Sequence, residues 1–188
     1  MEILSEIKNR KSKFLYKDTP IEKEKIELLI EAARWAPSCF NNQPWNYVLI
    51  DKDASSREAV EASLSLGNGW AKGAPLLVAV GGRTKDGCES QGIEYLLYDI
   101  GLSVMSMVIQ AEHLGLGSRQ MAGWNSEKLK SAVGFPHDFK PIVLVAFGYP
   151  AKPENLKEKI TDRLKEKLVR ARTRKAPEKN FFFDKYSE

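Results

Sequence analysis

Three short segments of this chain carry residue types that could bind an anionic, planar organic molecule. The first, at residues 10–13, reads Arg-Lys-Ser-Lys and gathers several cations and one hydroxyl. Arginine binds phosphate oxygens as a bidentate fork, lysine adds a point charge, and a serine hydroxyl donates a further hydrogen bond. The segment therefore suits a phosphate group, although a cluster of this kind is more often the solvated face of a helix.

The second segment, residues 36–45, holds two prolines, two asparagines and a glutamine between an expected helix and an expected strand. Its amide side chains can both donate and accept hydrogen bonds, as the polar edge of a heterocyclic ring requires. The other interpretation is an ordered turn, with Trp45 in the core.

The third segment, RARTRK at residues 170–175, lies near the C-terminal end. Taken alone, it indicates a solubilising basic tail. Together with the other two segments, however, it would suit an anionic cofactor.

The chain lacks the common signatures of hydrolases, nucleotide-binding proteins and metalloenzymes. No GxGxxG, P-loop, GxSxG or HExxH pattern occurs, and the two histidines are isolated from the two cysteines. We therefore expect no metal site and name no catalytic side chain; if the protein is an enzyme, a cofactor supplies its reactive group. Cys39 is expected to be a small buried filler without a redox role.

Composition indicates one ordinary globular domain. A length of 188 residues, with 43% hydrophobic and 29% charged side chains, is enough for a real core. The net charge of +4 suits an anionic small molecule but is too weak to indicate nucleic-acid binding. Two cysteines without a CxxC pattern predict no disulfide framework and favour a reducing, cytoplasmic setting.

Neither a signal peptide nor a membrane span is expected. The first 14 residues are charged throughout and have no apolar centre. The apolar stretch at residues 93–116 contains acidic residues and a histidine, which are costly in lipid. It is therefore interpreted as a buried helix.

Hydrophobic patterns predict interleaved helices and buried strands, which is typical of an α/β or α+β protein. Helices are expected at residues 5–13, 22–35, 93–114, 125–133 and 155–172, and a capping box of Ser55 and Glu58 predicts one more towards Leu66. Strands are expected at residues 45–51, 76–81, 118–124 and 142–148. Because the helix at 93–114 is apolar on every side, a partner subunit is a natural source of its surroundings.

Five stretches, in order, make the sequence resemble the nitroreductase-like FMN proteins along nearly its whole length. They are R-K-S at 10–12, E-A-A-R-W-A-P-S-C-F-N-N-Q-P-W at 31–45, G-N-G-W-A-K-G-A-P at 67–75, D-I-G-L-S-V at 99–104 with H-L-G-L-G-S-R-Q-M-A-G-W at 113–124, and R-T-R-K-A-P at 172–177. The resemblance implies an α+β fold with a central mixed sheet flanked by helices, dimerised through the long central helix. Residues 1–188 would form a single FMN-binding domain with a C-terminal arm at about 155–188.

The resemblance also implies which residues bind FMN at the interface of a homodimer, where the cofactor touches both subunits. Those at the phosphate would be Arg10, Lys11 and Ser12, joined by Arg172 or Arg174. Those bordering the flavin ring, partly from the partner subunit, would be Pro37, Ser38, Asn41 and Gln43. Asn68 would reach the ribityl chain or the pyrimidine edge. The backbone beside the ring, with an N–H near flavin N5, would belong to Met121, Ala122 and Gly123.

Two features depart from the family pattern. The family usually has a basic residue two places after the serine of its first motif, where this chain has Phe14. Lys13, one position away, is the candidate substitute for the charge near the phosphate or flavin O2. The chain also has no long insertion before the central helix, which predicts an open active-site rim and broad substrate tolerance.

The activity that the resemblance implies is an NAD(P)H-dependent oxidoreductase with two half-reactions at one site. NADH or NADPH would give a hydride to flavin N5 and leave, and a small-molecule oxidant such as a nitroaromatic or a quinone would take its place. One alternative is a flavoenzyme of the same fold with another reaction: flavin destruction, dehalogenation or ring oxidation. Another is a flavin-binding redox sensor with negligible turnover. The sequence does not separate the two enzymes, because that choice depends on loop shape.

Overall fold

The computed structural model describes residues 2–151 and 172–186 of the chain. The chain divides into two compact units, residues 1–152 and residues 153–188. In the second unit, the described residues include one 3-10 turn, Pro177–Lys179 (η5). The helix predicted at 155–172 falls on residues outside the described part, except for Arg172 at its end.

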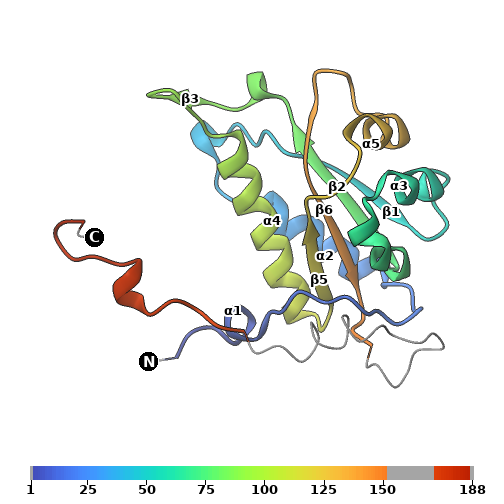
Figure 1. Cartoon of the computed structure of the whole chain (residues 1–188), viewed down its shortest axis with the longest axis horizontal. Helices are drawn as coiled ribbons and strands as arrows, with labels where there is room; N and C mark the ends of the chain where they lie inside the picture. The colour runs from blue at the N-terminus through green and yellow to red at the C-terminus, as the bar shows by residue number, and fades with distance from the viewer. Residues whose placement is uncertain (1, 152–171, 187–188) are drawn as a thin grey trace. The chain divides into compact units, whose positions relative to one another are not determined.

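A four-stranded sheet forms the centre of the first unit (Figure 1). Its order is β1-β2-β6-β5, and each neighbouring pair runs antiparallel. The strands are Asn46–Asp51 (β1), Leu76–Gly82 (β2), Lys140–Gly148 (β6) and Gly117–Met121 (β5). A parallel bridge from Ser12 to Ser118 places the N-terminal segment along β5, whereas the four strands themselves pair antiparallel. The four predicted strands are confirmed, with their ends shifted by a few residues.

Helices cover both faces of this sheet because its central strands are apolar on both sides. In β2, Leu76, Val78 and Val80 join one core cluster, with helices α2 (Lys23–Arg34) and α4 (Leu96–His113). Leu77 and Ala79 join a second cluster, with α3 (Arg57–Ser63) and α5 (Ser126–Val133). Side chains alternate between the two faces of a strand, so one strand contributes to both cores.

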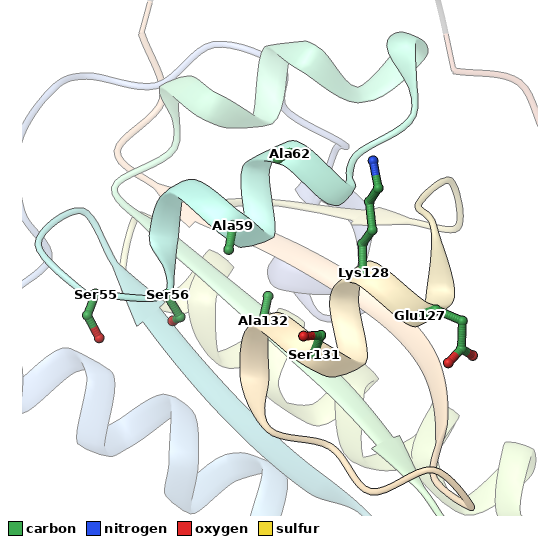
Figure 2. Close-up of a pocket in the computed structure, with 8 residues that line it drawn as sticks. All are labelled: Ser55, Ser56, Ala59, Ala62, Glu127, Lys128, Ser131 and Ala132. Atoms are coloured by element: carbon green, nitrogen blue, oxygen red, sulfur yellow. The ribbon is translucent and has the colours of Figure 1, made fainter.

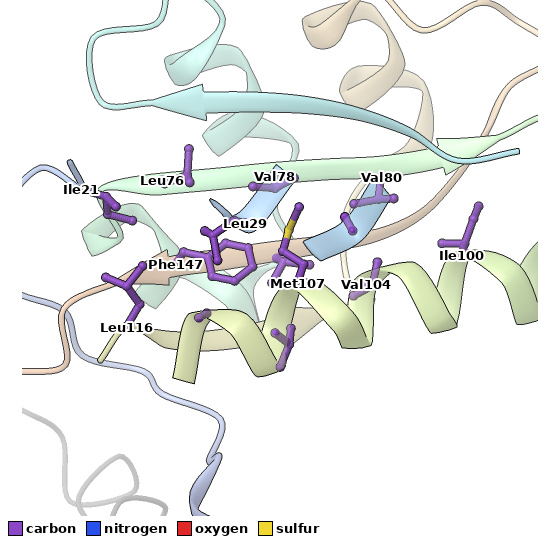
Figure 3. Packing of buried hydrophobic residues seen from close by; sticks show 14 of the residues in the cluster. Ile21, Leu29, Leu76, Val78, Val80, Ile100, Val104, Met107, Leu116 and Phe147 are labelled. Atoms are coloured by element: carbon purple, nitrogen blue, oxygen red, sulfur yellow. The ribbon is translucent and has the colours of Figure 1, made fainter. Parts of the chain in front are cut away.

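The larger cluster fixes α4 against the middle of the sheet. Figure 3 shows Phe147 of β6 beside Leu29 of α2 and Met107 of α4. Phe147 has no solvent exposure, and burying a side chain of this size contributes about 1.5–3 kcal/mol. The residues at the two ends of α4 are therefore held in fixed positions on the sheet.

The start of α4 differs from the prediction of a helix from residue 93. Ile93–Glu94 (β4) instead pairs with Glu89–Ser90 (β3) in a small hairpin. Both turn residues have positive φ, 54° at Gln91 and 77° at Gly92, which is the conformation favoured in two-residue hairpin loops. This turn removes three residues from the predicted helix.

The end of α4 agrees with the prediction of a glycine cap. Gly115 has a φ of 73°, and the N–H of Leu116 donates to the carbonyl of Ala111 at 2.8 Å. These are features of a Schellman ending, in which the glycine adopts a left-handed conformation.

The capping box predicted for α3 is wrong. Ser56 occupies the N-cap position and makes no side-chain capping hydrogen bond. The N–H of Arg57 donates instead to the carbonyl of Ala54 at 2.9 Å, so a backbone turn supplies the acceptor. The helix ends at Ser63, and a 3-10 segment, Leu66–Gly73 (η2), follows it.

The N-terminal helix is also shorter than predicted. It covers Ser5–Asn9 (α1), because the chain beyond it is extended along β5. The predicted cap of α5 is confirmed, since Asn125 accepts a hydrogen bond from the N–H of Lys128 at 3.0 Å. Two further 3-10 turns are Cys39–Asn41 (η1) and Thr84–Asp86 (η3). Among the described residues, no helix combines the length and apolarity needed to cross a lipid bilayer.

Candidate functional site

The basic segment, residues 10–13, lies against the edge strand β5. Before it, α1 is held to the last turn of α4, where a carboxylate oxygen of Glu6 lies 3.0 Å from Nδ1 of His113. This hydrogen bond lowers the pKa of Glu6 to about 2. After α1, Ser12 bridges Ser118, and the N–H of Lys13 donates to the Ser118 carbonyl at 3.0 Å. These contacts fix the backbone of the basic segment, in which Lys11 and Ser12 are exposed and Arg10 is half-buried.

The turn after β5 is joined to Asn68, which lies in η2. The side-chain amide of Asn68 donates to the carbonyl of Gly123 at 2.8 Å, and the N–H of Ser65 donates to the same oxygen at 3.1 Å. A Cβ atom at position 123 would lie 2.8 Å from Nδ2 of Asn68, so the close approach favours glycine. Met121 is buried in the core, whereas Ala122 is exposed.

An aromatic cluster connects the basic segment to this turn. It consists of Phe14, Tyr16 and Trp70 together with the guanidinium of Arg119 from β5. The guanidinium carbon lies 3.6 Å from the centre of the Phe14 ring and 5.1 Å from that of Trp70. The rings of Phe14 and Trp70 are themselves 5.4 Å apart. The structure thus brings together three groups that the sequence predicts separately: residues 10–12, Asn68 and residues 121–123.

Two polar atoms of the aromatic cluster are buried and find no hydrogen-bond partner within residues 2–151 and 172–186: Nε of Arg119 and Nε1 of Trp70. Burial lowers the pKa of Arg119. Arg119 is absent from the residues that the sequence predicts. The sequence did contain one indication of its importance. Arg119 lies just before the glycine turn, and position 14, where the family usually has a basic residue, holds phenylalanine.

The polar loop, residues 37–43, holds a second group of predicted residues in an unusual backbone conformation. Phe40, Asn41 and Gln43 have φ values of 49°, 57° and 47°. The N–H of Gln43 donates to Oγ of Ser38 at 2.9 Å, and its side-chain amide donates to Oδ1 of Asn41 at 3.2 Å. Pro37 precedes these contacts and is exposed. Non-glycine residues with positive φ persist only where the surroundings impose them.

Two contacts anchor the polar loop to the start of α4 and the segment before it. The N–H of Cys39 donates to both carboxylate oxygens of the buried Asp99 at 3.2 Å. Cys39 also forms a disulfide with Cys88, with their Cα atoms 6.1 Å apart. The expectations of a filler cysteine and of no disulfide were therefore wrong. The two cysteines are 49 residues apart in sequence, and only folding brings them together.

The two groups of predicted residues are attached to opposite ends of α4 within one chain. The polar loop contacts Asp99 in the first turn, whereas α1 contacts His113 in the last. These two positions are fourteen residues apart (113 − 99), which is about 21 Å along a helix axis. A site that uses both groups therefore needs a second copy of the chain or a ligand of considerable length.

The arginine pair near the C-terminus belongs to the second unit. Arg172 and Arg174 precede η5, and Nη1 of Arg174 donates to the carbonyl of Thr173 at 2.8 Å. Their role at the site stays a prediction.

Two hollows formed by the described residues contain none of the predicted site residues. The larger, of about 730 Å³, is an open groove between α3 and α5 lined mainly by serines and alanines (Figure 2). The smaller, of about 310 Å³, lies near the ends of β1 and β2 and is lined by Asp18, Asp51 and Asp53 among others. Neither offers the cationic surroundings that an anionic cofactor requires.

Known proteins match the chain in sequence and in fold. A model of the Nitroreductase family matches residues 7–66 and 57–149. An NADH dehydrogenase of Thermus thermophilus is 25% identical over 174 residues, which cover 76% of this chain and 84% of that protein. A Bacillus subtilis protein named FMN reductase, NAD(P)H, is 26% identical over 167 residues, with 80% and 66% covered. A solved oxidoreductase containing FMN is 26% identical, with a TM-score of 0.85 over 100% of this chain and 94% of that one.

The disulfide gives a direct test of how the polar loop is held. Protein purified without reductant and then denatured should show no free thiol, and two per chain after reduction. Cys88→Ser should speed hydrogen exchange of the amides at residues 38–43 by roughly tenfold or more, because the strained turn loses its covalent anchor. Amides of α5, remote in the fold, serve as the internal control. Two free thiols in the unreduced protein would contradict this anchoring.

Proposed function

Because the chain belongs to the nitroreductase family, we propose that it is an FMN-dependent oxidoreductase that takes electrons from NADH or NADPH. The Bacillus protein named FMN reductase and the solved oxidoreductase containing FMN support this proposal. The observation that carries it is a series of contacts that links the basic segment, through β5 and the aromatic cluster with its two unpartnered donors, to Asn68 and the Gly123 turn.

The residues at this place fit an anionic, planar cofactor. Three cations of the basic segment suit a phosphate dianion. Within the described residues, the two unpartnered donors need acceptors, and buried donors are rarely left without one. The carbonyl oxygens and ring nitrogens of a flavin are such acceptors.

Each predicted residue then has a place in the proposed site. Arg10, Lys11 and Ser12 bind the phosphate, joined by Arg172 or Arg174 of the C-terminal arm, so that residues 1–188 work as one FMN-binding domain. Asn68 binds the ribityl chain or the pyrimidine edge. The backbone of Met121, Ala122 and Gly123 lines the ring, and the opposite side is bordered by Pro37, Ser38, Asn41 and Gln43.

In this proposal the protein binds and orients, and bound FMN supplies the hydride chemistry at N5. One open site serves the nicotinamide and then the oxidant, which is a nitroaromatic, a quinone or a related acceptor. Cationic side chains and backbone N–H groups around the site stabilise added negative charge, as donors in an oxyanion hole do. No acidic or basic side chain is assigned a proton-transfer step.

We also propose that the site is completed in a homodimer through α4. Leu97, Tyr98 and Met105 on this helix are 57%, 61% and 40% exposed, although they are large and apolar. Tyr98 and Met105 are seven residues apart, which is about two helical turns, so they lie on one face of α4 and suit a twofold interface. Two antiparallel copies of α4 would bring the polar loop of one chain to the basic segment of the other. A cytoplasmic location would fit the use of NADH or NADPH, but the Cys39–Cys88 disulfide removes the argument for it from the cysteines.

Two other functions remain as alternatives to the proposed reductase. One is a flavoenzyme of this fold with a different reaction, and the other is a redox sensor with negligible turnover.

A turnover experiment tests the proposed function. Purified protein reconstituted with FMN should be yellow, and NADH or NADPH should bleach it without oxygen. Adding a nitroaromatic or a quinone should restore the colour and sustain nucleotide oxidation. Bleaching without recovery by any oxidant would favour the sensor, and a protein that never takes up FMN would end the proposal.

Arg10→Ala tests the phosphate assignment. The variant should bind FMN roughly 10–100-fold more weakly, because a charge-assisted hydrogen bond contributes about 1.5–3 kcal/mol. Riboflavin, which has no phosphate, should bind the variant and the parent alike in a fluorescence titration. Lys17→Ala, an exposed cation seven residues further on, is the control. Equal losses for the two ligands would show that Arg10 acts elsewhere.

Met105→Glu tests the dimer. A carboxylate buried at the middle of α4 in the proposed interface should shift the dimer to monomer at micromolar concentration, as measured by sedimentation velocity. FMN should be released together with dissociation if both chains build the site. Ala59→Glu, which places the same charge on exposed α3, should stay dimeric. A parent protein that sediments as a monomer would refute the assembly.

A further inference from the structure

Arg119 is held in an environment that is unusual for a cation. Its guanidinium lies 3.6 Å from the centre of the buried Phe14 ring, and Trp70 packs from a second direction at 5.1 Å. Its Nε is buried and accepted by no group in the described part of the chain. Nor does Arg119 form an ion pair with any described carboxylate.

The neighbouring polar groups do not compensate this charge. The hydroxyl of Tyr16 donates to the carbonyl of Lys13 at 3.1 Å, and burial raises the pKa of Tyr16, so the phenol stays neutral. Nε1 of Trp70 is a second buried donor to which the described residues offer no acceptor. Two donors, one of them on a cation, therefore lie in one aromatic cluster, and no described carboxylate pairs with that cation. Such an arrangement suits a ligand that brings negative charge and acceptor atoms.

The position of the aromatic cluster indicates which part of the ligand would lie near it. Arg119 follows Ser118, which bridges the basic segment, and precedes Met121 by two residues on β5. Trp70 follows Asn68 by two residues in η2. The basic segment already provides cations for a phosphate, whereas Asn68 and residues 121–123 are the groups proposed at the ring. Arg119 is therefore closest in the fold to the ring end of the proposed site.

Lys13 does not occupy this place. Its side chain packs on Gly117, where a Cβ atom would lie 2.6 Å from Cγ of Lys13. Phe14, the next residue, packs on Trp70 and Arg119. Adjacent residues of extended chain point in opposite directions, so the two side chains diverge. The cation beside position 14 is therefore Arg119, from the neighbouring strand β5.

We propose that Arg119, supported by the rings of Phe14 and Trp70, is the cation that binds the N1–O2 edge of the flavin and stabilises its reduced, anionic form. This inference rests on the proposed function. A cation at this edge favours negative charge on the ring, so it binds reduced FMN more tightly than oxidised FMN. The rings keep the guanidinium in place and limit its contact with water, which strengthens its electrostatic effect.

The midpoint potential of protein-bound FMN measures this effect directly. Arg119→Gln should weaken binding of reduced FMN relative to oxidised FMN by roughly tenfold, which lowers the two-electron potential by about 30 mV. The pKa of N1–H in the reduced, bound flavin should rise, as seen in its absorption spectrum. Arg119→Lys keeps a positive charge and should retain part of both effects.

Arg83→Gln is the matched control. Arg83 also lies over a phenylalanine ring, 5.9 Å from the centre of Phe139, but it is paired with Asp138 at 3.0 Å. Removing this compensated charge should leave the potential unchanged. Trp70→Phe provides an independent variant if Arg119→Gln does not fold. It deletes the second unpartnered donor and should weaken FMN and riboflavin equally.

The outcomes separate the possible failures. An unchanged potential in Arg119→Gln, with FMN still bound, would overturn the assignment of Arg119 and leave the proposed function intact. A loss of FMN affinity without a loss for riboflavin would move Arg119 to the phosphate and overturn its place at the ring. A parent protein that binds no FMN would end the proposed function itself.

Discussion

β2 and β6 lie side by side at the centre of the sheet. All of β2 and the second half of β6 are buried on both faces. Their alternating side chains must be covered by α2 and α4 on one face and by α3 and α5 on the other. The arrangement of these helices follows from that requirement. The edge strand β5 is positioned by its pairing with β6, and the N-terminal segment is positioned by its bridge to β5.

This arrangement separates the parts of the candidate site instead of collecting them in one cleft. The helix α4 carries the polar loop at its start and α1 at its end, so the rigid packing of the helix keeps them apart. In the proposed homodimer, a second copy of the chain with its α4 antiparallel to the first would reconcile this separation with one binding site. The same dimer would also cover the exposed apolar residues of α4.

Much of the fold could be predicted because the relevant signals are local. The continuous apolar run of residues 76–81 indicates a buried strand, and Gly115 indicates the end of α4. The hairpin before α4 could not be predicted from the sequence, because it depends on a positive φ at Gln91, and glutamine has no strong preference for that conformation. The length of α1 depends on the bridge from Ser12 to Ser118, which joins segments more than a hundred residues apart.

For the site, motifs identified Asn68 and residues 121–123, but the hydrogen bond that joins Asn68 to Gly123 came from the structure. Arg119 was missed because its environment is made by Phe14 and Trp70, which lie on other segments. The pairing of Cys39 with Cys88 had no local pattern at all. The sequence thus indicates residues whose neighbours are adjacent in the chain, and it misses residues whose environment is made by segments distant in sequence.

The disulfide has a consequence for the chain when it is not folded. It closes a loop of 49 residues that contains β1, α3, η2 and β2, so the ends of this stretch stay together even in denaturant. A cross-link over that length removes roughly 4 kcal/mol of conformational entropy from the unfolded ensemble. The oxidised and reduced forms can therefore share the same native contacts and still differ in stability. The cross-linked unfolded chain also exposes less surface, so oxidation gives a shallower dependence of stability on urea.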